Sequence, residues 1–201
     1  MLCLEKIEKV FGEKSVLSDV SITVNKGERA IVYGMSGSGK TTLLRIAAGL
    51  EKPTGGNVRR KGKTAVVFAE ARLFPSVTVL ENVTAVMGGD KTAAKEKALG
   101  ILSEVGLSEA ALLYPRELST GMAARVSLAR AVAYDADIYL LDEPFKSLDG
   151  EIKAMVMTYL NRFFHDKAVL IISHDKAEAE AMKCVRYTLS EGILRKESAL
   201  C

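Results

Sequence analysis

The segment Gly34-Met35-Ser36-Gly37-Ser38-Gly39-Lys40-Thr41 constrains the fold more than any other part of this 201-residue sequence. It matches the phosphate-loop pattern G-x-x-x-x-G-K-[ST], and it lies between a buried strand predicted at 29–33 and a helix predicted at 40–50. Its glycines let backbone N–H groups approach phosphate oxygens, and the helix N-terminus adds partial positive charge. The pattern therefore predicts a phosphate site at the end of a strand. A Gly/Ser turn that only caps a helix is the alternative.

Each residue type in this loop has a predicted task. We expect Lys40 to bridge the β- and γ-phosphates of ATP, and we expect the Thr41 hydroxyl to hold Mg²⁺. The other predicted phosphate-binding residues are Gly34, Ser36, Gly37, Ser38, Gly39 and Thr42. The predicted ligands of the chain are therefore ATP and Mg²⁺.

Hydrophobic periodicity predicts an α/β fold in one domain over 1–201. Alternation at 2–7 and 20–24 indicates half-buried antiparallel strands, and helical spacing indicates a helical insertion at about 77–133. Further strands are predicted at 64–68, 138–141 and 168–172, a helix at 151–164, and a terminal hairpin at 185–189 and 193–196. Alternating strands and helices favour a mainly parallel sheet, accompanied by an antiparallel β subdomain.

Charge and apolar content exclude some kinds of partner. A net charge of +3 is too small to argue for nucleic acid, so none is expected as a partner. The basic run at 59–63 is interpreted as a solvated hairpin loop, with a phosphate-binding patch as the alternative. Apolar runs are far shorter than the roughly 20 residues that cross a bilayer. We therefore expect a cytoplasmic location.

An acidic pair follows the apolar run at 138–141. Asp142 and Glu143 lie where ligands bind at the carboxyl ends of parallel strands. We expect Asp142 to support the Mg²⁺ shell and Glu143 to polarise the attacking water as a general base. Two solvated acids at a strand end are the alternative.

The segment Leu118-Ser119-Thr120-Gly121-Met122 resembles the signature of ATP-binding cassette (ABC) proteins. The resemblance continues at Ser147-Leu148-Asp149 and Ile172-Ser173-His174-Asp175, and it covers almost the whole chain. It implies a phosphate-loop NTPase of ABC ATPase type that closes as a head-to-tail dimer, with a second copy or a related cassette. ATP then lies between the phosphate loop of one cassette and the signature of the other.

The resemblance also implies tasks for single residues. Ser119 and Gly121 would meet a γ-phosphate, although Ser119 considered alone is a helix N-cap. His174 would contact the γ-phosphate and the attacking water, and Asp149 would communicate across the dimer. Phe11 matches the aromatic that stacks on adenine, while a core phenylalanine remains the alternative. Catalysis is thus assigned to Glu143, His174 and Lys40.

Two positions depart from the family pattern. Ala69 replaces the glutamine that touches Mg²⁺ or the attacking water, and Thr120 replaces the first signature glycine. An alanine lacks a polar group, so we expect weaker hydrolysis or altered coupling, with nucleotide binding retained.

Three functions remain open from the sequence. The preferred one is the ATPase subunit of a transporter, peripheral on the inner face of the cell membrane with a transmembrane permease as partner. The segment 71–83 most resembles importers of the nitrate, sulfonate and taurine group. The second is a nucleotide-gated regulatory cassette with weak or no hydrolysis. The third, a phosphate-loop kinase, leaves the signature and Ser173-His174 unexplained.

Overall fold

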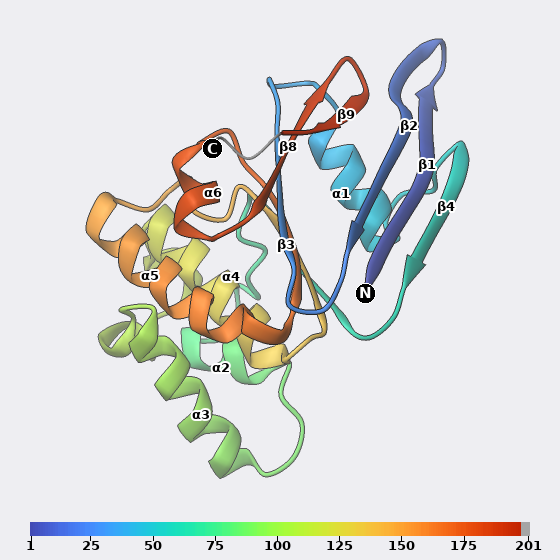
Figure 1. Cartoon of the computed structure of the whole chain (residues 1–201). Coiled ribbons are helices and arrows are strands. Elements are labelled where there is room, and N and C mark those ends of the chain that lie inside the picture. Colours follow the sequence, from blue (N-terminus) through green and yellow to red (C-terminus); the bar gives the residue numbers. More distant parts are fainter. Residues whose placement is uncertain (198–201) are drawn as a thin grey trace. The chain divides into compact units, whose positions relative to one another are not determined.

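The computed structural model describes residues 1–197 (Figure 1). Contacts between Cα atoms divide the chain into two compact units. We call residues 1–66, 137–143 and 164–197 the sheet unit, and Val67–Ala136 with Pro144–Phe163 the helical unit. The assignment of 1–201 to one domain, with a helical part at about 77–133, stays a prediction.

The sheet unit contains an antiparallel three-stranded sheet. Its strands are β1 (Leu2–Phe11), β2 (Lys14–Val24) and β4 (Gly55–Arg60), in the order β2-β1-β4. The strands predicted at 2–7 and 20–24 are thereby confirmed. Phe11 pairs with Lys14 across the β1–β2 turn, where Gly12 takes a φ of 58° that favours glycine.

The second sheet of this unit has six strands in the order β5-β6-β7-β3-β8-β9. They are β3 (Arg29–Tyr33), β5 (Thr64–Val67), β6 (Ile138–Asp142), β7 (Ala168–Ile172), β8 (Val185–Ser190) and β9 (Ile193–Lys196). Strand β3 pairs in parallel with β7 and β8, β6 pairs in parallel with β7, and β8–β9 is the predicted hairpin. The carboxyl ends of β3 and β6 therefore point the same way.

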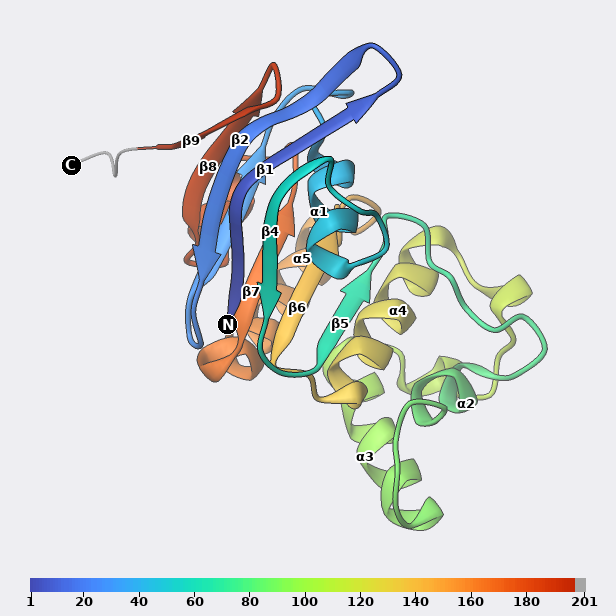
Figure 2. The ribbon, with the colours of Figure 1, turned by 90° about the vertical axis from the view of Figure 1, so that its right-hand side faces the viewer.

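Helix α1 (Lys40–Ala48) fills the core of the sheet unit (Figure 2). Its buried residues Leu43, Leu44, Ile46 and Ala47 join a hydrophobic cluster with residues of both sheets. Gly49 ends the helix with a φ of 76°, the left-handed conformation common after a helix. Packing on one face thus fixes the position of α1, which begins after the loop at 34–39 that follows β3. The unit also holds η3 (Phe164–Asp166) and the short α6 (Ala177–Ala181).

The helical unit consists of packed helices and two 3₁₀ turns. These are α2 (Val79–Thr84), α3 (Lys91–Glu104), η1 (Ser108–Ala110), η2 (Pro115–Glu117), α4 (Thr120–Tyr134) and α5 (Gly150–Phe163). Helices α2, α3 and α4 contact one another, and α3 also contacts α5. A capping box between Thr78 and Glu81 begins α2, and the Asp90 side chain caps α3. Within residues 1–197, no helix combines the length and apolar character needed to cross a membrane.

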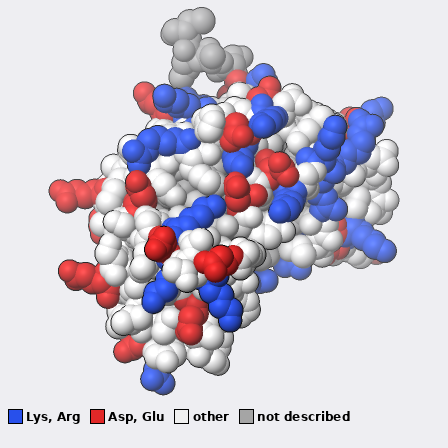
Figure 3. All heavy atoms as spheres, turned by 90° about the horizontal axis from the view of Figure 1, so that it is seen from below, with Lys and Arg blue, Asp and Glu red and all other residues white. Residues whose placement is uncertain are grey.

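The prediction of a hairpin loop at 59–63 is wrong. Strand β4, which the sequence pattern does not predict, pairs with β1, whereas β5 belongs to the six-stranded sheet, so the run connects two sheets. Its path is fixed by the Lys63 N–H, which donates to the Asp137 carboxylate at 2.8 Å. On the face that Figure 3 shows, Lys and Arg are interspersed with Asp and Glu. The absence of a nucleic-acid partner stays a prediction.

Candidate nucleotide-binding site

The phosphate loop lies between β3 and α1, as the sequence predicts. The Lys40 side chain folds back over the loop, where its Nζ donates to the carbonyl oxygens of Gly34 at 2.7 Å and Met35 at 2.9 Å. Gly37 and Gly39 have φ values of 80° and 101°, which favour glycine. The loop is therefore held in a ring around the Lys40 ammonium, next to the free N–H groups that begin α1.

Gly34 and Ser38 show how closely this loop is packed. A Cβ on Gly34 would lie 2.3 Å from the Leu189 carbonyl oxygen and 2.6 Å from Ser38 Oγ, so only glycine fits. Ser38 Oγ is buried and has no hydrogen-bond partner within residues 1–197. An unpaired buried hydroxyl costs about 1–3 kcal/mol. It is a donor that an anionic ligand oxygen would satisfy, which fits a bound phosphate.

Thr41 and Asp142 meet at the start of α1 and the end of β6. Thr41 Oγ1 donates to Asp142 Oδ2 at 3.2 Å, and Asp142 is 5% exposed. Burial raises the pKa of Asp142, which is the largest effect. The hydrogen bond from Thr41 lowers this pKa, the negative charge of Glu143 raises it further, and the positive charge of Lys40 lowers it. A hydroxyl and a carboxylate beside a phosphate site are the hard oxygen ligands that Mg²⁺ takes. These residues therefore fit the predicted metal.

Glu143 departs from the strand geometry of Asp142. It has a φ of 48°, in the left-handed region that costs a non-glycine residue roughly 1–2 kcal/mol. The turn directs its side chain to His174, with Glu143 Oε2 and His174 Nδ1 separated by 2.7 Å. The Glu143 side chain is 17% exposed and that of His174 is 60% exposed. Such strain commonly lies at functional sites, and here it brings together the two predicted catalytic groups.

The loop that carries His174 is itself fixed by hydrogen bonds. The buried Ser173 donates its N–H to the Val32 carbonyl at 3.2 Å, and its Oγ accepts from the Asp175 N–H at 3.0 Å. Tyr33 Oη donates to the Lys176 carbonyl at 3.2 Å. Burial, which outweighs the nearby Arg186 charge, raises the pKa of Tyr33 to about 12, so the hydroxyl keeps its proton. His174 is thus held on both sides.

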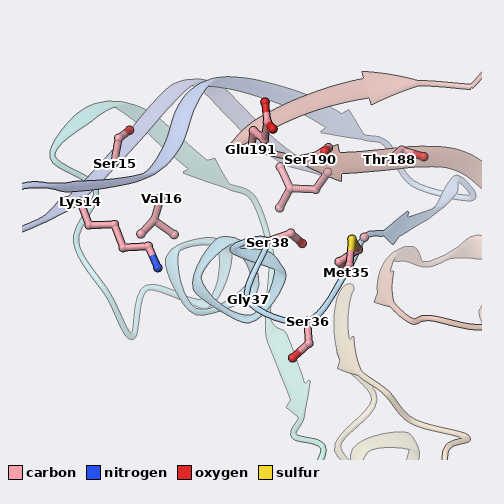
Figure 4. A pocket seen from close by; sticks show the side chains of 13 residues that line it. Lys14, Ser15, Val16, Met35, Ser36, Gly37, Ser38, Thr188, Ser190 and Glu191 are labelled. Atoms are coloured by element: carbon pink, nitrogen blue, oxygen red, sulfur yellow. The ribbon is translucent and has the colours of Figure 1, made fainter.

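A pocket of about 470 Å³ adjoins the phosphate loop (Figure 4). It is lined by Lys14, Ser15, Val16, Gly34, Met35, Ser36, Gly37, Ser38, Thr188, Leu189, Ser190, Glu191 and Gly192. The residues from β2 and from the β8–β9 hairpin are not among the predicted site residues, because no sequence motif marks them. The hairpin reaches the loop through the parallel pairing of Tyr33 with Thr188.

Phe11 lies in the same unit but does not line this pocket. Phe11 is 48% exposed, and the Lys9 ammonium lies 4.6 Å from the centroid of its ring. Exposure argues against the core alternative. Phe11 nevertheless pairs with Lys14, and directly opposed residues of an antiparallel pair share a face. Adenine stacking on Phe11 stays a prediction. Thr42 is half-buried on α1.

The signature segment 118–122 lies in the helical unit. Ser119 is the N-cap of α4, where its Oγ accepts from the Met122 N–H at 3.2 Å. A Cβ on Gly121 would lie 2.6 Å from the Ser147 carbonyl oxygen, so this glycine allows a close approach of two loops. Asp149 caps α5, accepting from the Ile152 N–H at 3.1 Å. The parts assigned to Ser119, Gly121 and Asp149 across a dimer stay predictions.

The two departures from the family pattern also lie in this unit. Ala69 and Thr120 are both exposed. The neighbouring Phe68 ring has the Arg72 guanidinium 4.0 Å from its centroid. Weaker hydrolysis or altered coupling through Ala69 stays a prediction.

Known relatives match the chain over nearly its whole length. A family model described as ABC transporter matches residues 17–146. The aliphatic sulfonates import ATP-binding protein of Corynebacterium glutamicum is 40% identical over 195 residues, covering 94% of this chain and 79% of that protein. A protein of the same description from Mesorhizobium japonicum is 38% identical, covering 98% of this chain and 80% of its own length.

Solved structures show the same fold. A dimeric bacterial ABC transporter cassette matches with a TM-score of 0.91 and 29% identity, over 100% of both chains. A dimeric ATP-binding cassette in a post-hydrolysis state, bound to ADP and Pi, matches with a TM-score of 0.89 and 28% identity, also over 100% of both chains. The predicted fold class, a phosphate-loop NTPase of ABC ATPase type, is confirmed. The chain belongs to the ABC transporter family.

Proposed function

We propose that this chain drives the import of aliphatic sulfonates by hydrolysing ATP beneath a transmembrane permease, as a cytoplasmic subunit peripheral to the membrane. Two relatives that are 40% and 38% identical carry the description of aliphatic sulfonates import ATP-binding proteins. A neighbour bound to ADP and Pi supports hydrolysis over the alternative of a nucleotide-gated regulatory cassette. The segment 71–83 supports the same importer group.

ATP binding begins at the phosphate loop. Lys40 exchanges the carbonyl oxygens of Gly34 and Met35 for the β- and γ-phosphates, since its ammonium already lies within the loop. Backbone N–H groups of the loop and the Ser38 hydroxyl donate to the remaining phosphate oxygens. These contacts position the triphosphate at the carboxyl ends of β3 and β6.

In this proposal Thr41 and Asp142 would hold Mg²⁺, because their oxygens lie 3.2 Å apart beside the phosphate loop. The ion, when bound, neutralises charge on the β- and γ-phosphates. Asp142 must be ionised for this task. As the pH falls, its raised pKa means that metal binding is lost at a higher pH than for an exposed aspartate.

Hydrolysis uses the Glu143 and His174 pair. Glu143 accepts a proton from a water that attacks the γ-phosphorus, while the bond to the β–γ bridging oxygen breaks and yields ADP and phosphate. His174 orients Glu143 through the 2.7 Å contact and, being more exposed, contacts the γ-phosphate. The left-handed backbone at Glu143 keeps the base separate from the metal ligand Asp142.

The second copy of the cassette completes the site. Ser119 and Gly121 of one copy donate to the γ-phosphate held by the other, and Asp149 links the two sites. The dimeric solved relatives support this assembly. Closing of the dimer on ATP moves the permease, and release of the products reopens it.

The observation that carries the proposal is the arrangement of Thr41, Asp142, Glu143 and His174 around one phosphate loop. The test is uptake of labelled ethanesulfonate by host cells that lack the gene. We expect uptake to be lost, to return with the wild-type gene, and to stay absent with Lys40→Ala. Unchanged uptake in the deletion strain would contradict the sulfonate substrate class.

A further inference from the structure

Strand β3 carries different kinds of residue on its two faces. Ala30 and Val32 join the hydrophobic cluster that contains residues of α1. Arg29 and Tyr33 are four residues apart and lie on the opposite face, because side chains alternate along a strand. Tyr33 directly precedes Gly34, the first residue of the phosphate loop. The face of β3 opposite the cluster therefore offers a guanidinium and a hydroxyl close to the nucleotide site.

These two side chains bind the two ends of helix α6. Tyr33 Oη donates at 3.2 Å to the carbonyl oxygen of Lys176, the N-cap of α6. Arg29 Nη1 donates at 3.1 Å to the carbonyl oxygen of Met182, the C-cap of the same helix. Both contacts lie within the sheet unit. Strand β3 thus holds α6 at its beginning and at its end.

Helix α6 depends on such contacts because it is short. It has five residues, whereas isolated helices below roughly 12–15 residues are marginal in water. Carbonyl groups at the end of a helix need partners from outside it, and here the Arg29 guanidinium binds that of Met182. Burial lowers the pKa of Arg29, and a charge withdrawn from water requires hydrogen bonds. The contact between Arg29 and Met182 therefore serves both partners.

The loop that precedes α6 carries His174. Asp175 joins this loop to the first turn of α6, because its Oδ1 accepts from the Ala177 N–H at 2.9 Å. His174 Nδ1 lies 2.7 Å from Glu143 Oε2. A displacement of α6 would move Asp175 and so weaken the contact between His174 and Glu143.

We infer that Arg29 is a positioning residue for hydrolysis, which together with Tyr33 braces α6 against β3 and so holds His174 beside Glu143. Because β3 leads into the phosphate loop, the brace ties His174 to the strand that positions the triphosphate. Arg29 acts through His174 and not on the nucleotide. Its effect on turnover rests on the proposed hydrolysis, whereas the position of His174 can be measured without turnover.

NMR spectra of ¹⁵N-labelled imidazole rings test the brace directly. The chain has two histidines, so His165→Gln assigns both, and the exposed His165 serves as an internal control. The ring signals of His174 depend on its contact with Glu143, and Glu143→Ala shows where they lie without it. We expect Arg29→Gln to move the His174 signals toward those of Glu143→Ala and to leave the His165 signals in place.

Steady-state kinetics show whether the brace matters for hydrolysis. Arg29→Gln should lower kcat roughly threefold to tenfold and leave KM unchanged. Arg29→Lys should restore most of the kcat, because an ammonium also donates to a carbonyl. Arg59→Gln is the matched control, because Arg59 is an exposed arginine of the same unit that binds Glu5 on the antiparallel sheet. It should change neither the histidine signals nor kcat, since exposed ion pairs contribute little.

Tyr33→Phe is a milder break at the other end of α6 and should move the His174 signals in the same direction. If Arg29→Gln does not fold, Tyr33→Phe decides alone. His174 signals that stay at their wild-type positions in these variants would overturn the inference, as would a change in KM alone for Arg29→Gln. A wild-type chain that binds ATP without hydrolysing it would contradict the proposed function, while a shift of the His174 signals would still support the brace.

Discussion

Gly34→Ala tests whether the phosphate loop is positioned by its contact with β8. The added Cβ would lie 2.3 Å from the Leu189 carbonyl oxygen and 2.6 Å from Ser38 Oγ. An ordinary carbon–oxygen contact requires the carbonyl or the loop to retreat by roughly 1 Å. Neither moves easily, because Tyr33 and Thr188, the residues before this contact, are paired in the parallel sheet. Overpacking of this kind costs about 1–3 kcal/mol.

The assays are thermal unfolding and equilibrium ATP binding. A loss of about 1–3 kcal/mol lowers the melting temperature by about 2–4 °C per kcal/mol for a chain of this size, and the displaced loop raises the Kd for ATP about tenfold or more. Gly100→Ala in α3 is the control, because a Cβ there meets nothing within 4 Å. It should stabilise the chain by about 0.5–1 kcal/mol through helix propensity. A Gly34→Ala variant that melts and binds ATP like the wild type would refute the reasoning.

Three further substitutions test other parts of the site. Asp142→Asn should abolish Mg²⁺-dependent turnover yet raise the melting temperature without nucleotide. Burial raises the pKa of Asp142, so the folded chain binds this proton more tightly than the unfolded chain, and stability falls as pH rises through the raised pKa. The increase in melting temperature should therefore be larger at neutral than at acidic pH. An equal increase at both pH values would contradict this role of the buried carboxylate. Tyr33→Phe removes the hydrogen bond to the Lys176 carbonyl, which holds the loop of His174. The loss of about 1 kcal/mol should lower kcat roughly fivefold and leave KM unchanged. A change in KM alone would count against this role of Tyr33 in positioning His174. Ala69→Gln should raise kcat, by roughly tenfold if the restored amide orients water or metal, and an unchanged kcat would show that the alanine is tolerated.

Local patterns in the sequence suffice for much of the fold. The strands at 138–141 and 168–172 are continuous apolar runs, the strand at 29–33 is apolar after Arg29, and the structure buries nearly all of their residues in the parallel sheet. The meeting of Thr41 with Asp142 follows from the same reasoning, because the carboxyl ends of parallel strands share one edge. Motif and topology together thus predict where the residues lie that we propose to bind phosphate and Mg²⁺.

Long-range packing explains what the sequence does not reveal. Strand β4 begins with two glycines and has no buried residue, so its pairing with β1 leaves no periodic signal. The pocket wall from Thr188 to Gly192 reaches the phosphate loop only because β8 pairs with β3. Lys14 belongs to no motif, and its place in the pocket depends on the turn at Gly12. These features need tertiary structure.

The most direct test of the central claim is Mg²⁺-dependent ATP turnover by the purified chain, compared with Glu143→Gln. The glutamine keeps the size of the side chain and a polar contact for His174, but it cannot accept the proton. We predict that turnover falls roughly a hundredfold to ten-thousandfold in the variant, while its ATP binding stays at the wild-type level. Equal turnover by both proteins, or none by the wild type despite ATP binding, would contradict the account.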